Sequence, residues 1–178
     1  MIQSQEELES WYQKDDPWDY EDSFDDIKRR DILLAELPKR PYKNVLDIGC
    51  GHGFVTRELP GEKVIGLDMS ERAVRHANLD AKNNPKLSYV AGDLYKITEL
   101  FQRKTFDLII ITGVLYPQYI GNSKNLIYHL IDTCLDKSGI LMCVHISDWY
   151  KSRFPYIQLE KYIYDYRTYS HIMEIYQK

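Results

Sequence analysis

Hydrophobic and polar positions change their spacing at about residue 44 of this chain. Before that point, apolar side chains recur at the three- or four-residue spacing of amphipathic helices. Ser4 and Glu7 form a capping-box pattern that predicts a helix over 5–14, and a second helix is predicted over 23–37. The apolar stripe of the second helix comprises Phe24, Ile27, Leu34 and Leu37. Residues 1–43 are therefore predicted to be helical and to precede a main domain over 44–178.

Beyond residue 44, short apolar runs alternate with segments of helical spacing. The runs predict strands over 45–48, 63–68, 87–91, 106–112 and 139–146. Helices are predicted between them over 54–59, 71–82, 96–102 and 124–135. This alternation predicts right-handed crossovers and an α/β fold with a doubly wound, mostly parallel sheet.

The end of the chain breaks this alternation. Residues 156–166 and 170–177 predict two strands with no helix between them, hence an antiparallel hairpin. Only about ten residues separate Ile146 from Tyr156, too few for a full-length crossover helix. We therefore expect a single domain whose site is open, or is completed by a second copy or a partner subunit.

Composition and charge narrow the class of protein. Hydrophobic residues make up 44% of the chain and charged residues 28%, values typical of a globular domain. No apolar run is close to the length of a membrane span, which is about 18 residues. The first ten residues lack the apolar core of a secretory signal, and Cys50, Cys134 and Cys143 have no metal-ligand spacing. These features predict reduced thiols, a cytoplasmic location and no metal site. Residues 1–26 carry ten acidic side chains and one basic one, which argues against a nucleic-acid substrate and mildly favours a cationic amine.

The strand over 45–48 leads into a turn with glycines at alternate positions, Gly49, Gly51 and Gly53. Glycine lets a backbone turn sharply and lets a ligand approach the peptide planes. The dinucleotide fingerprint needs a small residue where this chain has Phe54 or Thr56, and no Gly-Lys-Ser/Thr follows. This spacing argues against a dehydrogenase and excludes a Walker loop. Asp47, two residues before Gly49, would repel a pyrophosphate and suits a ligand with positive charge.

Two more acidic residues follow predicted strands. Asp68 ends the strand over 63–68, where a carboxylate can accept both hydroxyls of a ribose. Asp93 follows the strand over 87–91 and can accept from an adenine amine, while Leu94 packs on the ring. In order and spacing, residues 44 to about 146 resemble the class I S-adenosylmethionine-dependent methyltransferases.

This resemblance implies an enzyme that binds S-adenosylmethionine and releases S-adenosylhomocysteine. It also implies a Rossmann-like sheet of seven strands in the order 3-2-1-4-5-7-6, with the seventh antiparallel. The cofactor would be held by Asp47, Gly49, Cys50, Gly51, Gly53, Asp68, Met69, Asp93, Leu94, Thr112 and Gly113.

A narrower resemblance involves the N-terminal aromatic residues. Trp11-Tyr12, Asp16-Pro17-Trp18 and Pro41-Tyr42 are similar to the nodulation-type N-methyltransferases, which act on an amino sugar, and to related sugar and metabolite methyltransferases. Trp11, Trp18 and Tyr20 can form an aromatic lid, since such rings stack on sugars and cover cations. The alternative is that these rings only dock the N-terminal helix.

Two residues are candidates for the chemistry. Tyr116 follows the fourth predicted strand, where members of this family present groups to the methyl, and would position the nucleophile or pack beside Pro117. His145 ends the fifth strand and is either a general base or a histidine of the core. The expected substrate-binding residues are Trp11, Trp18, Tyr20, Tyr116 and Asp148.

The sequence therefore predicts methyl transfer to a nitrogen or oxygen of a small molecule, such as a sugar-like or amine metabolite. The loop after the fourth strand lacks the Asn/Asp-Pro-Pro-Tyr/Phe motif of enzymes that methylate amide or base nitrogens, which counts against DNA and glutamine. The alternatives that stay open are an RNA or protein methyltransferase and a non-catalytic subunit that only binds the cofactor.

Overall fold

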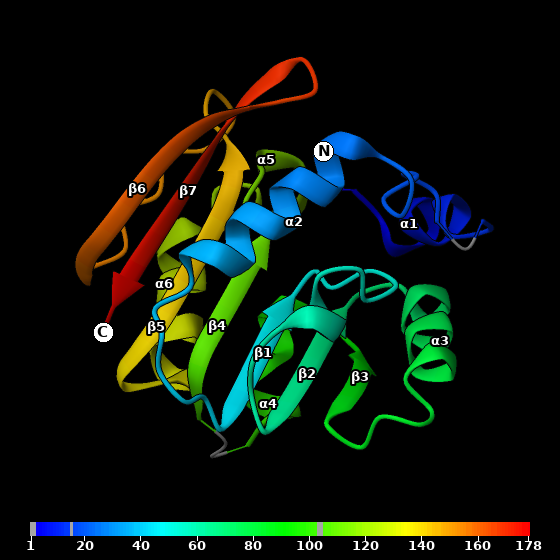
Figure 1. Ribbon diagram of the computed structural model, residues 1–178, viewed down its shortest axis with the longest axis horizontal. Coiled ribbons are helices and arrows are strands. Elements are labelled where there is room, and N and C mark those ends of the chain that lie inside the picture. The colour runs from blue at the N-terminus through cyan, green and yellow to red at the C-terminus, as the bar shows by residue number, and fades with distance from the viewer. Residues whose placement is uncertain (1–2, 15, 103–104) are drawn as a thin grey trace.

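A seven-stranded sheet organises the computed structural model, which describes residues 3–14, 16–102 and 105–178. Across the described residues the strand order is β3-β2-β1-β4-β5-β7-β6, the order that the family resemblance implies (Figure 1). The first five strands are parallel, whereas β7 runs antiparallel to both β5 and β6. The strands are β1 (Asn44–Ile48), β2 (Lys63–Asp68), β3 (Leu87–Ala91), β4 (Phe106–Thr112), β5 (Leu135–Ile146), β6 (Ile157–Tyr166) and β7 (Tyr169–Gln177). The predicted α/β class with a C-terminal antiparallel hairpin is confirmed.

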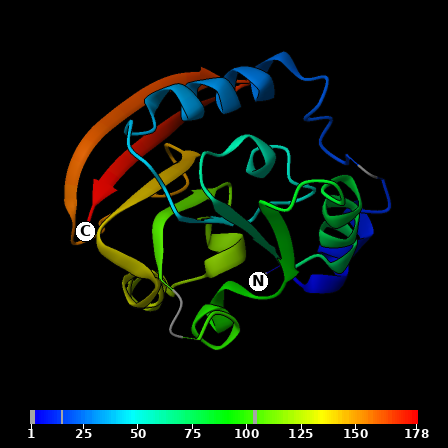
Figure 2. The ribbon, with the colours of Figure 1, turned by 60° about the horizontal axis from the view of Figure 1, so that its bottom comes forward.

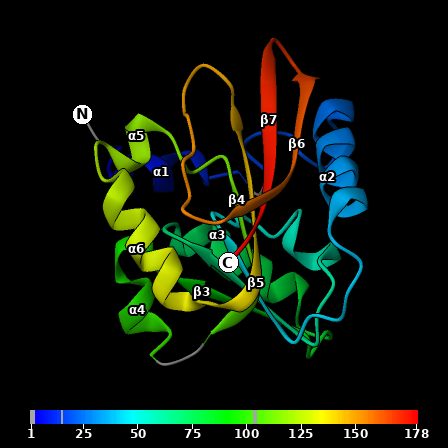
Figure 3. The ribbon, with the colours of Figure 1, turned by 90° about the vertical axis from the view of Figure 1, so that its left-hand side faces the viewer.

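Helices cover both faces of this sheet. Figure 3 shows α2 on one side and α4, α5 and α6 on the other. The helices are α1 (Gln5–Trp11), α2 (Phe24–Glu36), α3 (Glu71–Asp80), α4 (Ile97–Leu100), α5 (Pro117–Ile120) and α6 (Lys124–Cys134), with 3₁₀ turns η1 (Thr56–Glu58) and η2 (Leu94–Lys96). Neighbouring strand residues alternate between the two apolar layers, so Leu108 packs in the α2 layer and Ile109 in the other. Both side chains are fully buried, as the unbroken apolar run of β4 predicts.

Serine caps determine where α1, α2 and α3 begin. The side chains of Ser4, Ser23 and Ser70 each accept a hydrogen bond from the backbone three residues later. Glu9 on α1 accepts from the backbone N–H of Glu71 at 2.6 Å. This bond joins α1 to the start of α3, so the N-terminal segment lies over the carboxyl ends of the strands (Figure 1).

One predicted helix is wrong, and several predicted boundaries are shifted; the helix predicted over 5–14, for example, ends at Trp11. Residues 54–59 form a turn and η1, because the buried Phe54 inserts into the α2 layer instead of continuing a helix. The short helix predicted over 96–102 is α4, which covers only Ile97–Leu100 and follows η2. The strand β5 begins at Leu135, which pairs with Phe106 before a shift in register.

The predicted apolar stripe of α2 is correct at Ile27, Leu34 and Leu37, which pack in the α2 layer, and wrong at Phe24. Phe24 is 77% exposed, whereas Asp26, Arg29 and Leu33 are the buried residues of this helix. The polar residues point inward because α2 packs against the β6–β7 hairpin, which supplies partners for them (Figure 2). Tyr166 donates to Asp26 at 2.7 Å.

The crossover from β5 to β6 contains no helix in the described residues 147–156, as its length predicts. Within the described part of the chain, no helix is both long enough and apolar enough to cross a membrane.

Candidate active site

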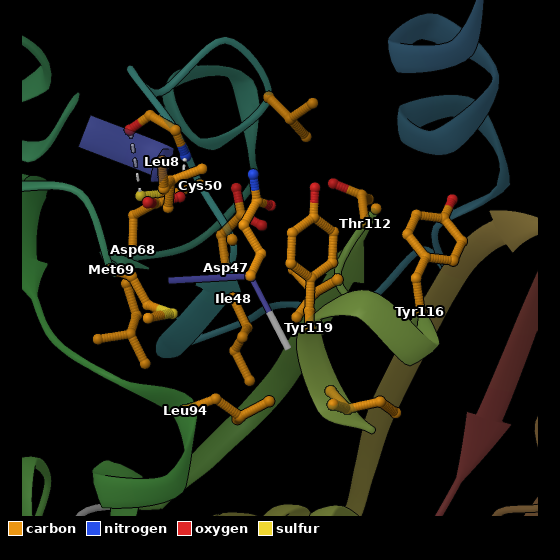
Figure 4. Close-up of a pocket in the computed structure, with 18 of the residues that line it drawn as sticks. Leu8, Asp47, Ile48, Cys50, Asp68, Met69, Leu94, Thr112, Tyr116 and Tyr119 are labelled. Carbon is orange, nitrogen blue, oxygen red and sulfur yellow. Dashed lines mark hydrogen bonds between the residues drawn. The ribbon is translucent and has the colours of Figure 1, made fainter. Parts of the chain in front are cut away.

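A cavity of about 340 Å³ lies at the carboxyl ends of β1, β2 and β4, below the N-terminal segment. It is lined by ten of the residues expected to hold the cofactor: Asp47, Gly49, Cys50, Gly51, Asp68, Met69, Asp93, Leu94, Thr112 and Gly113. Figure 4 shows Asp68 and Met69 at one end of the cavity and Tyr116 at the other, with Asp47 and Tyr119 between them. Gly53 does not line the cavity, because it packs toward Tyr89 on β3.

The turn after β1 depends on glycine at two positions. Gly49 has a φ of +79°, and a Cβ there would lie 2.1 Å from Cγ2 of Val114. Gly51 has a φ of +55°, and its Cβ would lie 2.8 Å from the Tyr12 hydroxyl. Any larger residue would therefore strain the backbone and displace the walls of the cavity.

Asp68 holds this turn in place. Its carboxylate accepts from the backbone N–H of Gly51 at 2.8 Å and from that of Ser70 at 2.9 Å. The side chain is buried, which raises the pKa of its carboxyl. Asp93 accepts from the backbone N–H of Tyr95 at 2.9 Å and so fixes the start of η2, next to the buried Leu94. The ends of β2 and β3 thus present one carboxylate each to the cavity.

Asp47 lines the cavity with a spare hydrogen-bonding atom. Its Oδ2 accepts from the Thr56 hydroxyl at 2.7 Å, whereas its Oδ1 is buried and has no partner in the described residues. Burial raises the pKa of this carboxyl to about 6, against the opposing effects of Thr56 and Arg29. A buried carboxylate oxygen without a partner is costly, so a cationic ligand would stabilise it.

Arg29 is a second buried charge in the same cavity, one that no sequence pattern predicted. It is 8% exposed, and its Nε has no partner among the described residues. The guanidinium lies 3.2 Å from Asp26 and over the rings of Tyr20 and Tyr166. The signal that would have found it is its position four residues before Leu33, on the buried face of α2.

Tyr116 forms the opposite wall. Its hydroxyl accepts from the backbone N–H of Ile146 at 3.1 Å, which leaves its own proton free to donate. Burial raises the pKa of Tyr116, so the hydroxyl stays protonated. Its ring packs 5.3 Å from that of Trp149, which also lines the cavity. The Tyr116 hydroxyl is therefore placed to donate a hydrogen bond to a molecule bound in the cavity.

The three N-terminal aromatic residues expected to form a lid lie in two places. Trp18 and Tyr20 line the cavity, with ring centroids 5.7 Å apart. Trp11 does not line it; this ring stacks on Trp18 from outside and is 53% exposed. Trp11 is thus placed to support Trp18 rather than to contact a ligand in the cavity.

His145 and Asp148, two further candidates, do not line the cavity. His145 is 1% exposed and lies between the carbonyl of Ile146, at 3.2 Å, and Glu174, at 3.3 Å. Side chains alternate along a strand, so Ile146 faces the cavity and His145 faces the opposite layer. Asp148 is exposed. The expectation that these two residues face a ligand is not met.

Besides Arg29, the cavity contains residues from distant segments that the sequence analysis did not assign to it. They are Gln3, Leu8, Tyr12, Tyr119, Tyr166 and His171. Tyr166 and His171 belong to the hairpin, and no local pattern relates them to the glycine turn. Only the pairing of β7 with β5 brings them to this edge of the sheet.

The fold and the glycine turn define a class I methyltransferase. Residues 39–174 match the model of a family described as a methyltransferase domain. Because this match covers most of the chain, the chain belongs to that family.

Known proteins of this class resemble the chain over different lengths. Malonyl-[acyl-carrier protein] O-methyltransferase of Halalkalibacterium halodurans is 32% identical over 50% of this chain, and nodulation protein S of Rhizobium tropici is 27% identical over 61%. These matches cover only 32% and 44% of the two relatives. The crystal structure of N-methyltransferase NodS from Bradyrhizobium japonicum in complex with S-adenosylhomocysteine has a TM-score of 0.80 at 20% identity and covers 97% of both chains. That likeness confirms the fold.

Proposed function

We propose that this protein transfers a methyl group from S-adenosylmethionine to a nitrogen or oxygen of a small acceptor, such as a sugar-like or amine metabolite. One observation carries the proposal: Asp47 and Arg29 present unpartnered buried atoms of opposite charge to one cavity. An α-amino acid carries an ammonium and a carboxylate, so its two charges match this pair. A dinucleotide has no α-amino acid part, and Asp47 would repel its doubly charged pyrophosphate.

The remaining lining residues suit the other parts of the same ligand. Asp68 would accept the ribose hydroxyls, and Asp93 with Leu94 would hold the adenine. The glycine turn and the neighbouring Cys50, Met69, Thr112 and Gly113 would contact the ligand closely. Asp47 would accept from the ammonium and Arg29 would donate to the carboxylate, which satisfies both unpartnered atoms.

When bound, S-adenosylmethionine supplies a methyl group on a positively charged sulfur that is a good leaving group. The chain's own task is then to orient the acceptor, which can contribute roughly 7–11 kcal/mol. Tyr116 would donate to the acceptor and hold its nucleophilic atom toward the methyl. We also propose that residues 1–43 act as a lid, since Trp18 and Tyr20 line the cavity from above. The three cysteines are free and buried, which supports a reducing compartment such as the cytoplasm.

Thermal unfolding with S-adenosylhomocysteine tests the proposal. At about 100 times its dissociation constant, a ligand stabilises a protein by roughly 2.7 kcal/mol. For a domain of this size, the Tm is expected to rise by about 5–10 °C. NAD and ATP are the controls and are expected to have no effect. A shift with NAD, or none with S-adenosylhomocysteine, would refute the proposal.

The pH dependence of binding is a second prediction. The ammonium pairs with ionised Asp47, so affinity is full above the pKa of about 6 and falls as the pH drops below it. From about pH 7.5 to about pH 5, the affinity for S-adenosylhomocysteine is expected to fall about tenfold. Isothermal titration calorimetry measures this change. The Asp47→Asn variant is expected to bind S-adenosylhomocysteine more weakly at pH 7.5, with an affinity that no longer depends on pH. If its affinity still fell at low pH, a group other than Asp47 would be responsible for the pH dependence.

A further inference from the structure

The C-terminal hairpin supplies one wall of the cavity. Tyr166 ends β6 and His171 lies near the start of β7, and both line the cavity together with Tyr116 and Trp149. The rings of Tyr166 and His171 stack with centroids 4.1 Å apart. His171 pairs with Ile146 across β5 and β7, and the backbone N–H of Ile146 donates to the Tyr116 hydroxyl, so this wall lies near Tyr116.

His171 has polar atoms that the described chain leaves unpaired. The residue is 3% exposed, its Nδ1 is buried, and neither ring nitrogen has a hydrogen-bond partner among the described residues. A buried imidazole usually has at least one partner, because an unpaired polar group loses its hydration without compensation. A ligand that donates a hydrogen bond from the cavity would supply that partner.

A cluster of paired charges lies beside this wall. The single carboxylate of Asp26 pairs with Arg29 at 3.2 Å and with Arg167 at 2.7 Å, and it also accepts from Tyr166 at 2.7 Å. Burial, together with Arg29 and His145, lowers the pKa of His171 to about 4, although Asp26 opposes this. The imidazole is therefore neutral near pH 7 and able to accept a hydrogen bond.

We propose that His171 accepts the hydrogen bond, and then the proton, of a neutral hydroxyl on a flat ring held between Tyr116, Trp149 and Tyr166. This inference rests on the proposed function and names its acceptor class. Tyr116 and Trp149 line the cavity as an edge-to-face aromatic pair, and aromatic side chains favour contact with a flat ring. A protonated amine has no lone pair to attack with, and the neutral imidazole of His171 is too weak a base to remove its proton.

The methyl transfer needs only the acceptor hydroxyl, the methyl donor and the imidazole of His171. An electron pair of the hydroxyl oxygen forms the new bond to the methyl carbon, and the bond from that carbon to sulfur breaks with its pair left on sulfur. The hydroxyl proton passes to the imidazole of His171. Methylation makes that proton strongly acidic, so a weakly basic imidazole suffices to accept it.

Binding to the protein loaded with S-adenosylhomocysteine tests the acceptor class directly. The probes are catechol, a neutral hydroxyl-bearing ring, and benzylamine, a cationic ring of similar size. Calorimetry is expected to show binding of catechol and at least tenfold weaker binding of benzylamine, whose charged ammonium would lose its hydration in the cavity. Equal or tighter binding of benzylamine, or no binding of catechol, would overturn the inference. Failure of S-adenosylhomocysteine itself to bind would instead refute the proposed function.

Variants of His171 test the residue. His171→Phe keeps the ring stacked on Tyr166 and is expected to bind catechol about tenfold more weakly, with unchanged affinity for S-adenosylhomocysteine. His171→Gln keeps an acceptor and is expected to restore catechol binding. With S-adenosylmethionine and catechol, kcat is expected to fall about a hundredfold in both variants, while KM rises only in His171→Phe.

His145→Phe is the matched control, because His145 is an equally buried histidine on the adjacent strand and does not line the cavity. It is expected to bind catechol like the unchanged protein. Unaltered catechol binding and kcat in His171→Phe, or equal losses in His145→Phe, would show that His171 only packs against Tyr166.

Discussion

Replacement of Asp68 by alanine is expected to lower the affinity for S-adenosylhomocysteine by about 10²–10⁴-fold. The carboxylate holds the backbone of Gly51 and of Ser70 and is proposed to accept two ribose hydroxyls. Each hydrogen bond to a charged group contributes roughly 1.5–3 kcal/mol, and two such bonds to the ligand account for this range. Calorimetric titration of the purified variant measures the loss.

A matched control separates this effect from damage to the fold. Asp107, near the amino end of β4, also accepts from two backbone N–H groups, those of Lys43 and Asn44, at 2.7 and 3.1 Å. It lies at the edge of the sheet opposite the cavity and does not line it. Asp107→Ala is expected to lower the Tm and to leave affinity unchanged. If both variants lose affinity equally, Asp68 acts only through the stability of the sheet.

Replacement of Arg29 by methionine is expected to weaken the binding of S-adenosylhomocysteine by about 10²–10⁴-fold. The ligand's carboxylate would then be buried without its partner, and breaking a buried ion pair costs roughly 3–5 kcal/mol. Methionine keeps most of the volume that packs against Tyr20 and Tyr166. Asp26 keeps Arg167 as a partner, which limits the damage to α2.

A truncated ligand makes this prediction specific. 5′-Deoxy-5′-methylthioadenosine has the adenine, ribose and sulfur of the cofactor but lacks the amino acid. The protein's affinity for this ligand is expected to be unchanged by Arg29→Met and strongly reduced by Asp68→Ala. Of these two residues, only Asp68 is proposed to contact the part of the cofactor that the ligand retains. Equal weakening of both ligands by Arg29→Met would contradict the assignment of Arg29 to the carboxylate.

The parts of the site that local sequence could predict lie within a few residues of one another or at strand ends. Asp47, Gly49 and Gly51 follow from a single strand and turn, because a sharp turn at positive φ requires glycine. Asp68 and Asp93 follow from the rule that parallel strands present their carboxyl ends at one edge. All five residues line the cavity. Their roles in binding remain predictions until the variants are measured.

The parts that could not be predicted depend on which face of an element is covered. His145 and Ile146 are adjacent in sequence, yet only Ile146 lines the cavity, because the register of β5 decides which neighbour points inward. From the pattern of the amphipathic helix alone, Arg29 is predicted to be a solvent-exposed charge. It becomes a buried cavity residue only because the β6–β7 hairpin packs beside α2.

Linear patterns predicted the α/β class, the strand order through the family resemblance, and the half of the cavity built by the glycine turn and the strand ends. These features depend on local backbone geometry and on apolar periodicity, which a linear pattern records. Tertiary structure alone decided the opposite half, where Arg29, Tyr166 and His171 meet. Those residues come from α2 and a hairpin more than a hundred positions later, and their shared burial arises from packing, which no local pattern encodes.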